Sequence, residues 1–240
     1  MTHQNAIIRL KINANKQKDR MLATISHELR TPLNGILGMI QIVEQKTKNK
    51  EILENLSICK NSGQLLLGLV NSILDLNLIR ANKFRLIREQ IHFENFLNDI
   101  LHLFEYQCKL KSIYLKLKIS SLTPKFITTD KSRLSQILIN LIGNALKFTN
   151  KGGITISVEP YLKDREYIEI TVEDTGVGIQ EKDKGKLFQI FGKLENEKEG
   201  TAVNSQGVGL GLTISNNLAK ILCGNENLQG IQLESEYHKG

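Results

Sequence analysis

Residues 22–43 read LATISHELRTPLNGILGMIQIV, and their apolar positions decide the fold of the N-terminal part of the chain. Apolar side chains recur there at alternating spacings of three and four residues, which is the period of one face of an α-helix. These positions are Leu22, Ile25, Leu29, Leu33, Ile36, Ile40 and Val43. Sustained over several turns, the pattern is typical of a helix that packs along its length in a coiled-coil-like seam.

A second apolar series with the same spacing follows the polar patch Lys46–Lys50. Its members are Ile52, Leu56, Cys59, Gly63, Leu66, Val70 and Ile73. Two helices joined by a polar turn predict an antiparallel hairpin within residues 6–80. Because one hairpin leaves its seam open to water, we predict that two copies pair into a four-helix bundle, which makes the protein a homodimer. A plain coiled-coil spacer has the same periodicity and is the alternative.

Beyond residue 80 the helical period ends in a charged stretch, residues 81–92, which we interpret as a linker. The remainder predicts helices over 93–110, 131–148 and 210–222, with Asp130 as an N-cap, and strands over 113–119, 154–158 and 167–172. Residues 180–206 are polar and predict a long loop. Helices beside a small sheet indicate an α+β fold. The predicted organisation is therefore a hairpin domain over 1–80, a linker over 81–92 and an α/β domain over 93–240.

The composition of the chain indicates which partners and which cellular location to expect. The 240 residues carry a net charge of +7, with 40% hydrophobic residues and no Trp. Lys and Arg are scattered without interleaved aromatics, so we predict no nucleic-acid partner. The 3 cysteines lie far apart without metal-ligand spacing, which favours reduced thiols. No uninterrupted run of 18 apolar residues occurs. We therefore expect no membrane contact within this segment and a cytoplasmic location, even if the segment belongs to a membrane-anchored parent protein.

The first candidate for chemistry is His27, within the segment Ser26–Pro32 of the first predicted helix. At about 100° per residue, the imidazole points away from the apolar seam and into solvent. A neutral imidazole is a nucleophile near pH 7, and the adjacent Glu28 can orient it or take its proton. Thr31 lies one turn further on the same face. Considered alone, an exposed His beside a Glu is more often ordinary surface.

The second candidate is the segment NLIGNALKFT, residues 140–149. Asn140 and Asn144 stand four residues apart on one face of a predicted helix, and Lys147 follows on that face. Amide oxygens are ligands suited to Mg²⁺, and a Lys supplies positive charge for phosphate. The alternative is that both Asn side chains form hydrogen bonds within a buried helix.

The third candidate is VEDTGVGI, residues 172–179, at the end of a predicted strand. Asp174 can accept a hydrogen bond from an adenine amino group. Gly176 and Gly178 allow the backbone to turn and to approach the base closely. Asp-x-Gly is also a common turn, so this segment is weak by itself.

The fourth candidate is QGVGLGL, residues 206–212, which leads into the last predicted helix. Gly207, Gly209 and Gly211 would present backbone N–H groups to phosphate at a helix N-terminus. The segment lacks the third glycine and the preceding strand of a dinucleotide-binding fingerprint, and no P-loop pattern occurs in the chain.

Taken together, these segments resemble the ordered motifs of sensor histidine kinases over residues 20–223. Residues 27–34 resemble the H box, 140–149 the N box, 172–179 the G1 box and 206–212 the G2 box. Residues 187–191, LFQIF, resemble a variant F box within the lid over ATP, although packing of its two Phe is the alternative. The segment around His27 is similar to that of hybrid kinases.

The resemblance implies roles for particular residues. His27 would be the phosphoacceptor, Glu28 its acid/base partner, and Thr31 the residue that positions water when a response regulator is dephosphorylated. Asn140 and Asn144 would hold Mg²⁺ and ATP.

The resemblance also implies a fold and partners. Residues 93–240 would form an ATP-binding α/β sandwich of the GHKL (Bergerat) type, with Asp174 on adenine and Lys147 and the glycines near the nucleotide. The partner would be the receiver domain of a response regulator. The family continues into one more strand where this chain ends at Gly240, so we expect an exposed sheet edge. An ATP-driven machine on the same fold, or a scaffold with a degenerate site, are the rival interpretations.

Overall fold

The structure is a computed structural model that describes residues 24–25, 28–81, 83–161, 167–189, 210–224 and 230–237. The chain divides into two units, residues 1–85 and residues 86–240. Leu22 and His27 of the predicted hairpin, and most of the predicted loop before the last helix, lie outside the described residues.

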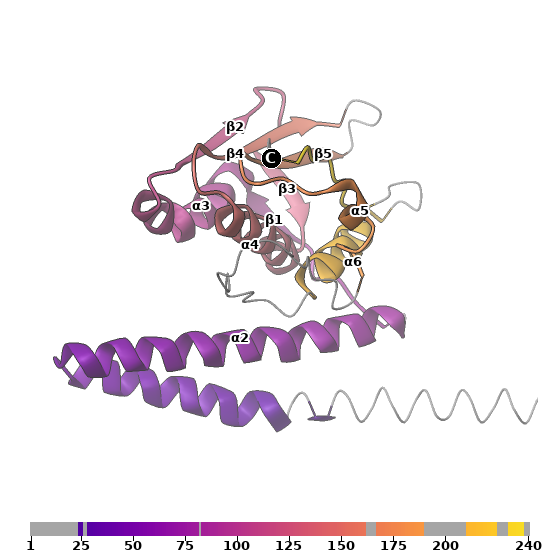
Figure 1. Cartoon of the computed structure of the whole chain (residues 1–240). Coiled ribbons are helices and arrows are strands. Elements are labelled where there is room, and N and C mark those ends of the chain that lie inside the picture. The colour runs from indigo at the N-terminus through magenta and orange to yellow at the C-terminus, as the bar shows by residue number, and fades with distance from the viewer. Residues whose placement is uncertain are drawn as a thin grey trace, which may run out of the picture. The chain divides into compact units, whose positions relative to one another are not determined.

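The first unit is the predicted hairpin (Figure 1). Residues 28–46 are helical, residues 47–49 form the turn, and α2 spans Lys50–Arg80. Asn49 caps α2 by accepting a hydrogen bond from the Ile52 N–H at 3.3 Å. Polar contacts join the helices: Arg30 donates to Asn71 at 2.7 Å, and Lys60 pairs with Glu44 at 2.8 Å.

Close packing within the hairpin accounts for the glycine in the apolar series. A Cβ added at Gly63 would lie 2.9 Å from Leu37 Cδ2, which is tighter than side chains pack. The helices therefore approach closely at this position. Among the described residues of the first unit, the buried apolar side chains are Leu33, Ile40, Val70 and Leu76.

Most of the predicted seam is nevertheless exposed in the single chain. Ile36 is 56% exposed and Leu66 is 51% exposed. The other exposed seam residues are Ile25, Leu29, Val43, Cys59, Ile52 and Ile73. Periodicity identified the apolar positions, but the hairpin buries only the subset that faces its own second helix.

One helix among the described residues, α2, is long and apolar enough to cross a membrane when judged by length and composition alone. The sequence analysis expected no such segment. Helices that pack in soluble proteins meet the same criterion, and α2 carries the polar contacts to the first helix given above. The criterion therefore does not distinguish a membrane span from a bundle helix here.

The second unit is an α/β layer with a small additional ribbon. Its elements are β1 (Glu89–His92), α3 (Phe93–Leu110), β2 (Tyr114–Ile119), β3 (Phe126–Thr129), α4 (Lys131–Phe148), β4 (Gly153–Pro160), β5 (Ile168–Asp174), α5 (Glu181–Lys184) and α6 (Gly211–Cys223). The main sheet has the order β2-β4-β5, with β2 parallel and β5 antiparallel to β4. Strands β1 and β3 form a separate antiparallel pair.

Helices α3 and α4 cover one face of the main sheet (Figure 1). The central strand β4 contributes Ile154, Ile156 and Val158, all fully buried. They pack in one core with Leu97 from α3 and Ile142 from α4. This core fixes α4 against the sheet, and α4 carries the segment that the sequence analysis singled out.

The predicted helices over 93–110 and 131–148 have the observed bounds, and Asp130 caps α4 by accepting from the Arg133 N–H at 3.0 Å. The short strands β1 and β3 and the helix α5 were not predicted. Strand β1 occupies the end of the stretch that the sequence analysis interpreted as a linker. It was missed because its four residues carry no alternating apolar pattern.

Candidate nucleotide site and phosphoacceptor helix

The predicted phosphoacceptor segment, residues 27–34, belongs from Glu28 onward to the first helix of the hairpin. His27 is outside the described residues, while Glu28 and Thr31 are exposed on the helix that covers residues 28–46. Leu33 is buried on another face of the same helix. Solvent therefore reaches the side of the helix that the sequence analysis assigned to chemistry.

Asn140 on α4 contacts the beginning of α6. Its Nδ2 donates a hydrogen bond to the Ser215 hydroxyl at 2.9 Å, and Ser215 is 1% exposed. A Cβ added at Gly211 would overlap the Oδ1 atom of Asn140, so a larger residue at this position would displace the Asn140 side chain. The structure thus brings together two predicted site residues from segments about 70 positions apart, Asn140 and Gly211.

Asn144 and Lys147 continue along α4, and both are half-buried. The side chain of Asn144 has no hydrogen-bond partner among the described residues. The Lys147 ammonium lies 5.1 Å from the centroid of the Phe148 ring. An amide group and a positively charged side chain thus follow Asn140 on the same helix.

Asp174 ends β5 and is held by two donors. The Gly176 N–H donates to Asp174 Oδ1 at 2.8 Å, and the hydroxyl of Thr149 lies 3.4 Å from the same oxygen. Thr149 directly follows α4 and is fully buried. Both donors use Oδ1, so Oδ2 has no hydrogen-bond partner within the part of the chain that the structure describes. Asp174 can therefore accept a hydrogen bond from a ligand.

The turn after β5 requires its glycines. A Cβ at Gly176 would lie 2.6 Å from Asp174 Oδ1 and 2.7 Å from the Phe148 carbonyl oxygen. Gly178 has a φ of +66°, which favours glycine. The end of α4 and the turn after β5 therefore lie directly against each other.

Lys111 fixes the end of α4 from the other side. Its ammonium donates to the carbonyl of Leu146 at 2.6 Å and to that of Thr149 at 3.2 Å. These contacts satisfy carbonyls that the helix leaves unpaired, and the charge is favourable at a helix C-terminus. Sequence reasoning missed both Lys111 and Thr149, because their partners lie more than twenty residues away.

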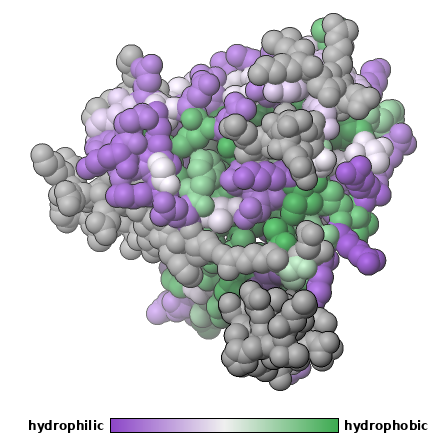
Figure 2. All heavy atoms as spheres, turned by 90° about the vertical axis from the view of Figure 1, so that its right-hand side faces the viewer, coloured by the Kyte–Doolittle hydropathy of each residue, from purple (hydrophilic) through white to green (hydrophobic). Residues whose placement is uncertain are grey.

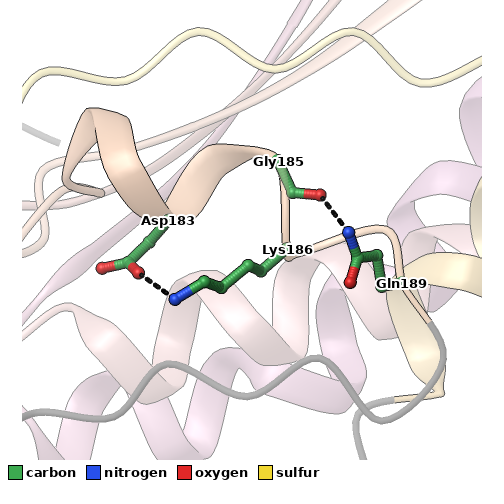
Figure 3. A network of polar contacts seen from close by, with 4 residues as sticks. All are labelled: Asp183, Gly185, Lys186 and Gln189. Carbon is green, nitrogen blue, oxygen red and sulfur yellow. Dashed lines mark hydrogen bonds and ion pairs between the residues drawn. The ribbon is translucent and has the colours of Figure 1, made fainter.

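Residues 181–189, at the start of the predicted loop, fold into α5 and a tight turn (Figure 3). Lys186 pairs with Asp183 at 3.5 Å, and Gln189 donates to the Gly185 carbonyl at 3.3 Å. The hydroxyl of Thr213 on α6 donates to the Phe188 carbonyl at 3.0 Å. This contact ties the start of the predicted F box to α6.

The remainder of the predicted lid lies outside the described residues, as do Gly207 and Gly209. On the side of the molecule that carries α5 and α6, hydrophilic and hydrophobic residues are interspersed (Figure 2).

The cysteines and acidic residues do not form a metal centre in the described part of the chain, where no group of three or more His, Cys, Asp or Glu is placed to hold an ion. Burial raises the pKa of the Cys108 thiol, an effect that the nearby Lys111 charge opposes, and burial also raises the pKa of Cys223. Both thiols therefore favour the protonated form. The amides of α4 and the carboxylate of Asp174 are oxygen groups of the candidate site.

Two family profiles match the chain in succession. Residues 17–82 match the His Kinase A (phospho-acceptor) domain. Residues 129–240 match the histidine kinase-, DNA gyrase B-, and HSP90-like ATPase domain. The chain belongs to the sensor histidine kinase family, with a helical phosphoacceptor hairpin followed by an ATP-binding α/β domain.

Similar proteins include hybrid kinases. Hybrid signal transduction histidine kinase B of Dictyostelium discoideum is 35% identical over 95% of this chain, which covers 11% of that protein. The autoinducer 2 sensor kinase/phosphatase LuxQ of Vibrio cholerae is 34% identical over 91% of this chain and 25% of its own length. The chain thus spans a quarter or less of these two relatives.

A solved structure of full-length ShkA in complex with AMPPNP is also similar. It has a TM-score of 0.65 and 33% identity, and the match covers 83% of this chain and 40% of that one. The histidine kinase AdeS of Acinetobacter baumannii matches with a TM-score of 0.53 and 27% identity, over 80% of this chain and 85% of its own. The predicted succession of hairpin and ATPase-type domain is confirmed by these matches.

Proposed function

We propose that this chain is a kinase core that uses ATP to phosphorylate His27 and then passes the phosphoryl group to an aspartate of a response-regulator receiver domain. The observation that carries the proposal is the junction at α4. The middle of this helix places Asn140 against Gly211 and Ser215, and Thr149, directly after its last residue, lies against Asp174. A single helix thereby joins the two halves of a nucleotide site, in a chain that also carries the phosphoacceptor motif.

In the proposed site, Asp174 recognises adenine. Its Oδ1 is held by Thr149 and Gly176, which orients Oδ2 to accept a hydrogen bond from the exocyclic amino group. Such a contact is charge-assisted and therefore strong. Lys147 adds positive charge for the phosphates, and Gly207, Gly209 and Gly211 supply backbone N–H groups beside them.

The residues present fit a Mg²⁺ ion. Asn144 offers an amide oxygen that is not engaged by the described residues, and Asn140 uses its nitrogen on Ser215, which leaves its oxygen as an acceptor. Oxygen donors in small number suit Mg²⁺, which is commonly held by few protein ligands and by substrate phosphates. When bound, the ion would neutralise phosphate charge.

The phosphoryl transfer itself is assigned to the hairpin. An imidazole nitrogen of His27 attacks the γ-phosphorus, the bond to the bridging oxygen breaks, and ADP leaves. Glu28 takes up the imidazole proton, and positioning contributes most of the rate. When the receiver domain is dephosphorylated, Thr31 positions the water that attacks the phosphorus of the phosphoaspartate, which releases inorganic phosphate and restores the aspartate.

A homodimer completes the proposed assembly. The exposed seam residues Ile36 and Leu66 are apolar side chains that a second hairpin would cover in a four-helix bundle. The domain boundaries proposed are 1–80 for this bundle, 81–92 for the connection and 93–240 for ATP binding. We place this core in the cytoplasm, with neither nucleic acid nor membrane as a partner of this segment.

The test compares wild-type protein with H27Q and D174N, using γ-labelled ATP with Mg²⁺ and a separate titration of ATP binding. We expect label in the wild type only. H27Q should bind ATP with unchanged affinity, whereas D174N should bind it weakly. ATP turnover that persists in H27Q without protein labelling would instead support the ATP-driven machine, and the absence of ATP binding by the wild type would support the scaffold.

A further inference from the structure

Residues 230–237, here called the C-terminal segment, connect α6 to the turn after β5. At one end the Ile231 N–H donates to Asn216 Oδ1 at 2.9 Å. At the other end the Ile179 N–H donates to the Ser235 hydroxyl at 2.9 Å. Both contacts join this segment to elements of the nucleotide site, although Ser235 lies 56 residues from Ile179.

The contact with Ser235 fixes the far end of the turn that carries Asp174. The near end of the turn is held by the hydrogen bond from the Gly176 N–H to Asp174. Beyond it, Gly178 adopts a φ of +66° and packs so closely on the Glu236 carbonyl oxygen that a Cβ would overlap it. The backbone of a turn with two glycines can adopt many conformations, so contacts from outside the turn determine its position.

The contact with Asn216 fixes the other end of the C-terminal segment to the phosphate side of the site. Asn216 follows Ser215, which bonds Asn140, on the helix that begins at Gly211. Gly230, with a φ of +79°, brings its Cα against the same Asn216 oxygen. The segment therefore begins on the helix that contacts the proposed metal ligand and ends on the turn that contacts adenine.

The pattern of burial indicates that Ser235 is placed for its hydroxyl. Within the C-terminal segment Ile231, Leu233 and Ser235 are half-buried, while the residues between them are exposed. The first two inward positions are apolar, and the third supplies a hydroxyl where Ile179 needs an acceptor. An apolar side chain there would leave a partly buried N–H without a partner, which is unfavourable.

We propose that Ser235 and Asn216 are positioning residues that hold the turn carrying Asp174 at a fixed separation from α6, and so set the affinity for adenine nucleotides. The inference rests on the proposed ATP binding at this site. Neither residue touches the nucleotide: each acts through the backbone it holds. Their loss therefore loosens the site for the ligand and leaves the reacting groups on the hairpin unchanged.

The experiment measures ATP and ADP affinity by calorimetric titration, and KM and kcat for labelling, in S235A, S235T and N216A. S121A is the matched control, because Ser121 is exposed in a turn of the same unit. We expect S235A and N216A to weaken binding and raise KM by about 3- to 10-fold, the size of one hydrogen bond. The kcat should stay within about twofold. S235T keeps the hydroxyl and should restore binding, and S121A should match the wild type.

Wild-type affinity in S235A would overturn the inference while leaving the proposed function intact. A lower kcat at unchanged KM would overturn it as well. If S235A lowers the unfolding midpoint and S235T restores stability without restoring affinity, Ser235 serves folding only and the inference fails. Wild-type protein that binds no adenine nucleotide would overturn both this inference and the proposed function.

Discussion

The two units of this chain differ in how completely they bury their apolar residues. The ATP-binding unit closes its own core: Leu97, Ile142 and Ile154 are all fully buried within one chain. The hairpin leaves Ile36 and Leu66 more than half exposed. A unit with a closed core can position a ligand by itself, whereas a unit with an open apolar face needs a partner to be complete. The proposed nucleotide site and the proposed dimer therefore reside in different units and respond to different substitutions.

The largest effect is expected from D174N. Asn keeps an oxygen for Gly176 and Thr149 but loses the negative charge that strengthens a hydrogen bond from adenine. Loss of a charge-assisted hydrogen bond of about 1.5–3 kcal/mol corresponds to roughly 10- to 100-fold weaker ATP binding, measured by calorimetry. The molar mass in solution should stay that of the dimer. A monomeric D174N would show that the nucleotide site and the dimer are not independent. Unchanged ATP affinity would contradict the proposed role of Asp174.

I36E is expected to affect the dimer and to leave ATP binding unchanged, which is the reverse of D174N. A charge on the exposed seam opposes burial in a bundle, so the dimer should dissociate at micromolar concentration in analytical ultracentrifugation. ATP affinity should be unchanged. Leu103 on α3 is 60% exposed and Ile36 is 56% exposed, which makes L103E a matched control that should remain dimeric. If L103E dissociates the dimer and I36E does not, the dimer forms through the ATP-binding unit and the proposed helical bundle is wrong.

A smaller effect is expected at Thr149. T149V removes the buried hydroxyl beside Asp174 with little change of shape, so one donor to the carboxylate is lost. We expect about 3- to 10-fold weaker ATP binding, equivalent to about 1 kcal/mol. T149S keeps the hydroxyl and should bind like the wild type. If the two variants bind ATP equally, Thr149 does not orient Asp174.

The smallest effect is expected at alkaline pH from Cys108. Burial raises the pKa of this thiol in the folded state, so the unfolded chain loses its proton first as pH rises. The contribution of the protonated thiol to stability is complete below the ordinary thiol pKa and falls as pH increases toward the raised value.

Denaturant titrations of wild type and C108A at neutral and alkaline pH test this dependence. The difference in the free energy of unfolding between wild type and C108A should be smaller at alkaline pH than at neutral pH. C59A is the control for the loss of a thiol, because Cys59 is exposed.

The sequence predicted those parts of the fold whose signals are local. Helices α3 and α4 have the predicted bounds because their apolar periodicity is strong and Asp130 is a recognisable cap. Strands β1 and β3 were missed because each has four residues and is stabilised by pairing with the other. The apolar series in the hairpin were predicted, but periodicity alone does not tell which members face the second helix and which face a partner.

The residues of the candidate site likewise fall into those that local sequence predicted and those that it did not. Asn140, Asp174 and Gly211 were found from short motifs, and the structure brings Asn140 to Gly211. Lys111, Thr149 and Ser235 were not found, since each acts on a partner brought near only by the tertiary fold. Local sequence thus indicates the groups proposed to meet the nucleotide better than the groups that hold them in place.

The measurement that tests the account most directly is the chemical stability of the label that the protein acquires from γ-labelled ATP and Mg²⁺. Phosphohistidine is lost in acid and retained in alkali, unlike a phosphoserine. We expect acid-labile, alkali-stable label in the wild type and in H102Q, a control at an exposed His on α3, and none in H27Q. Acid-stable label, or label that persists in H27Q, would contradict the assignment of His27 as the phosphoacceptor.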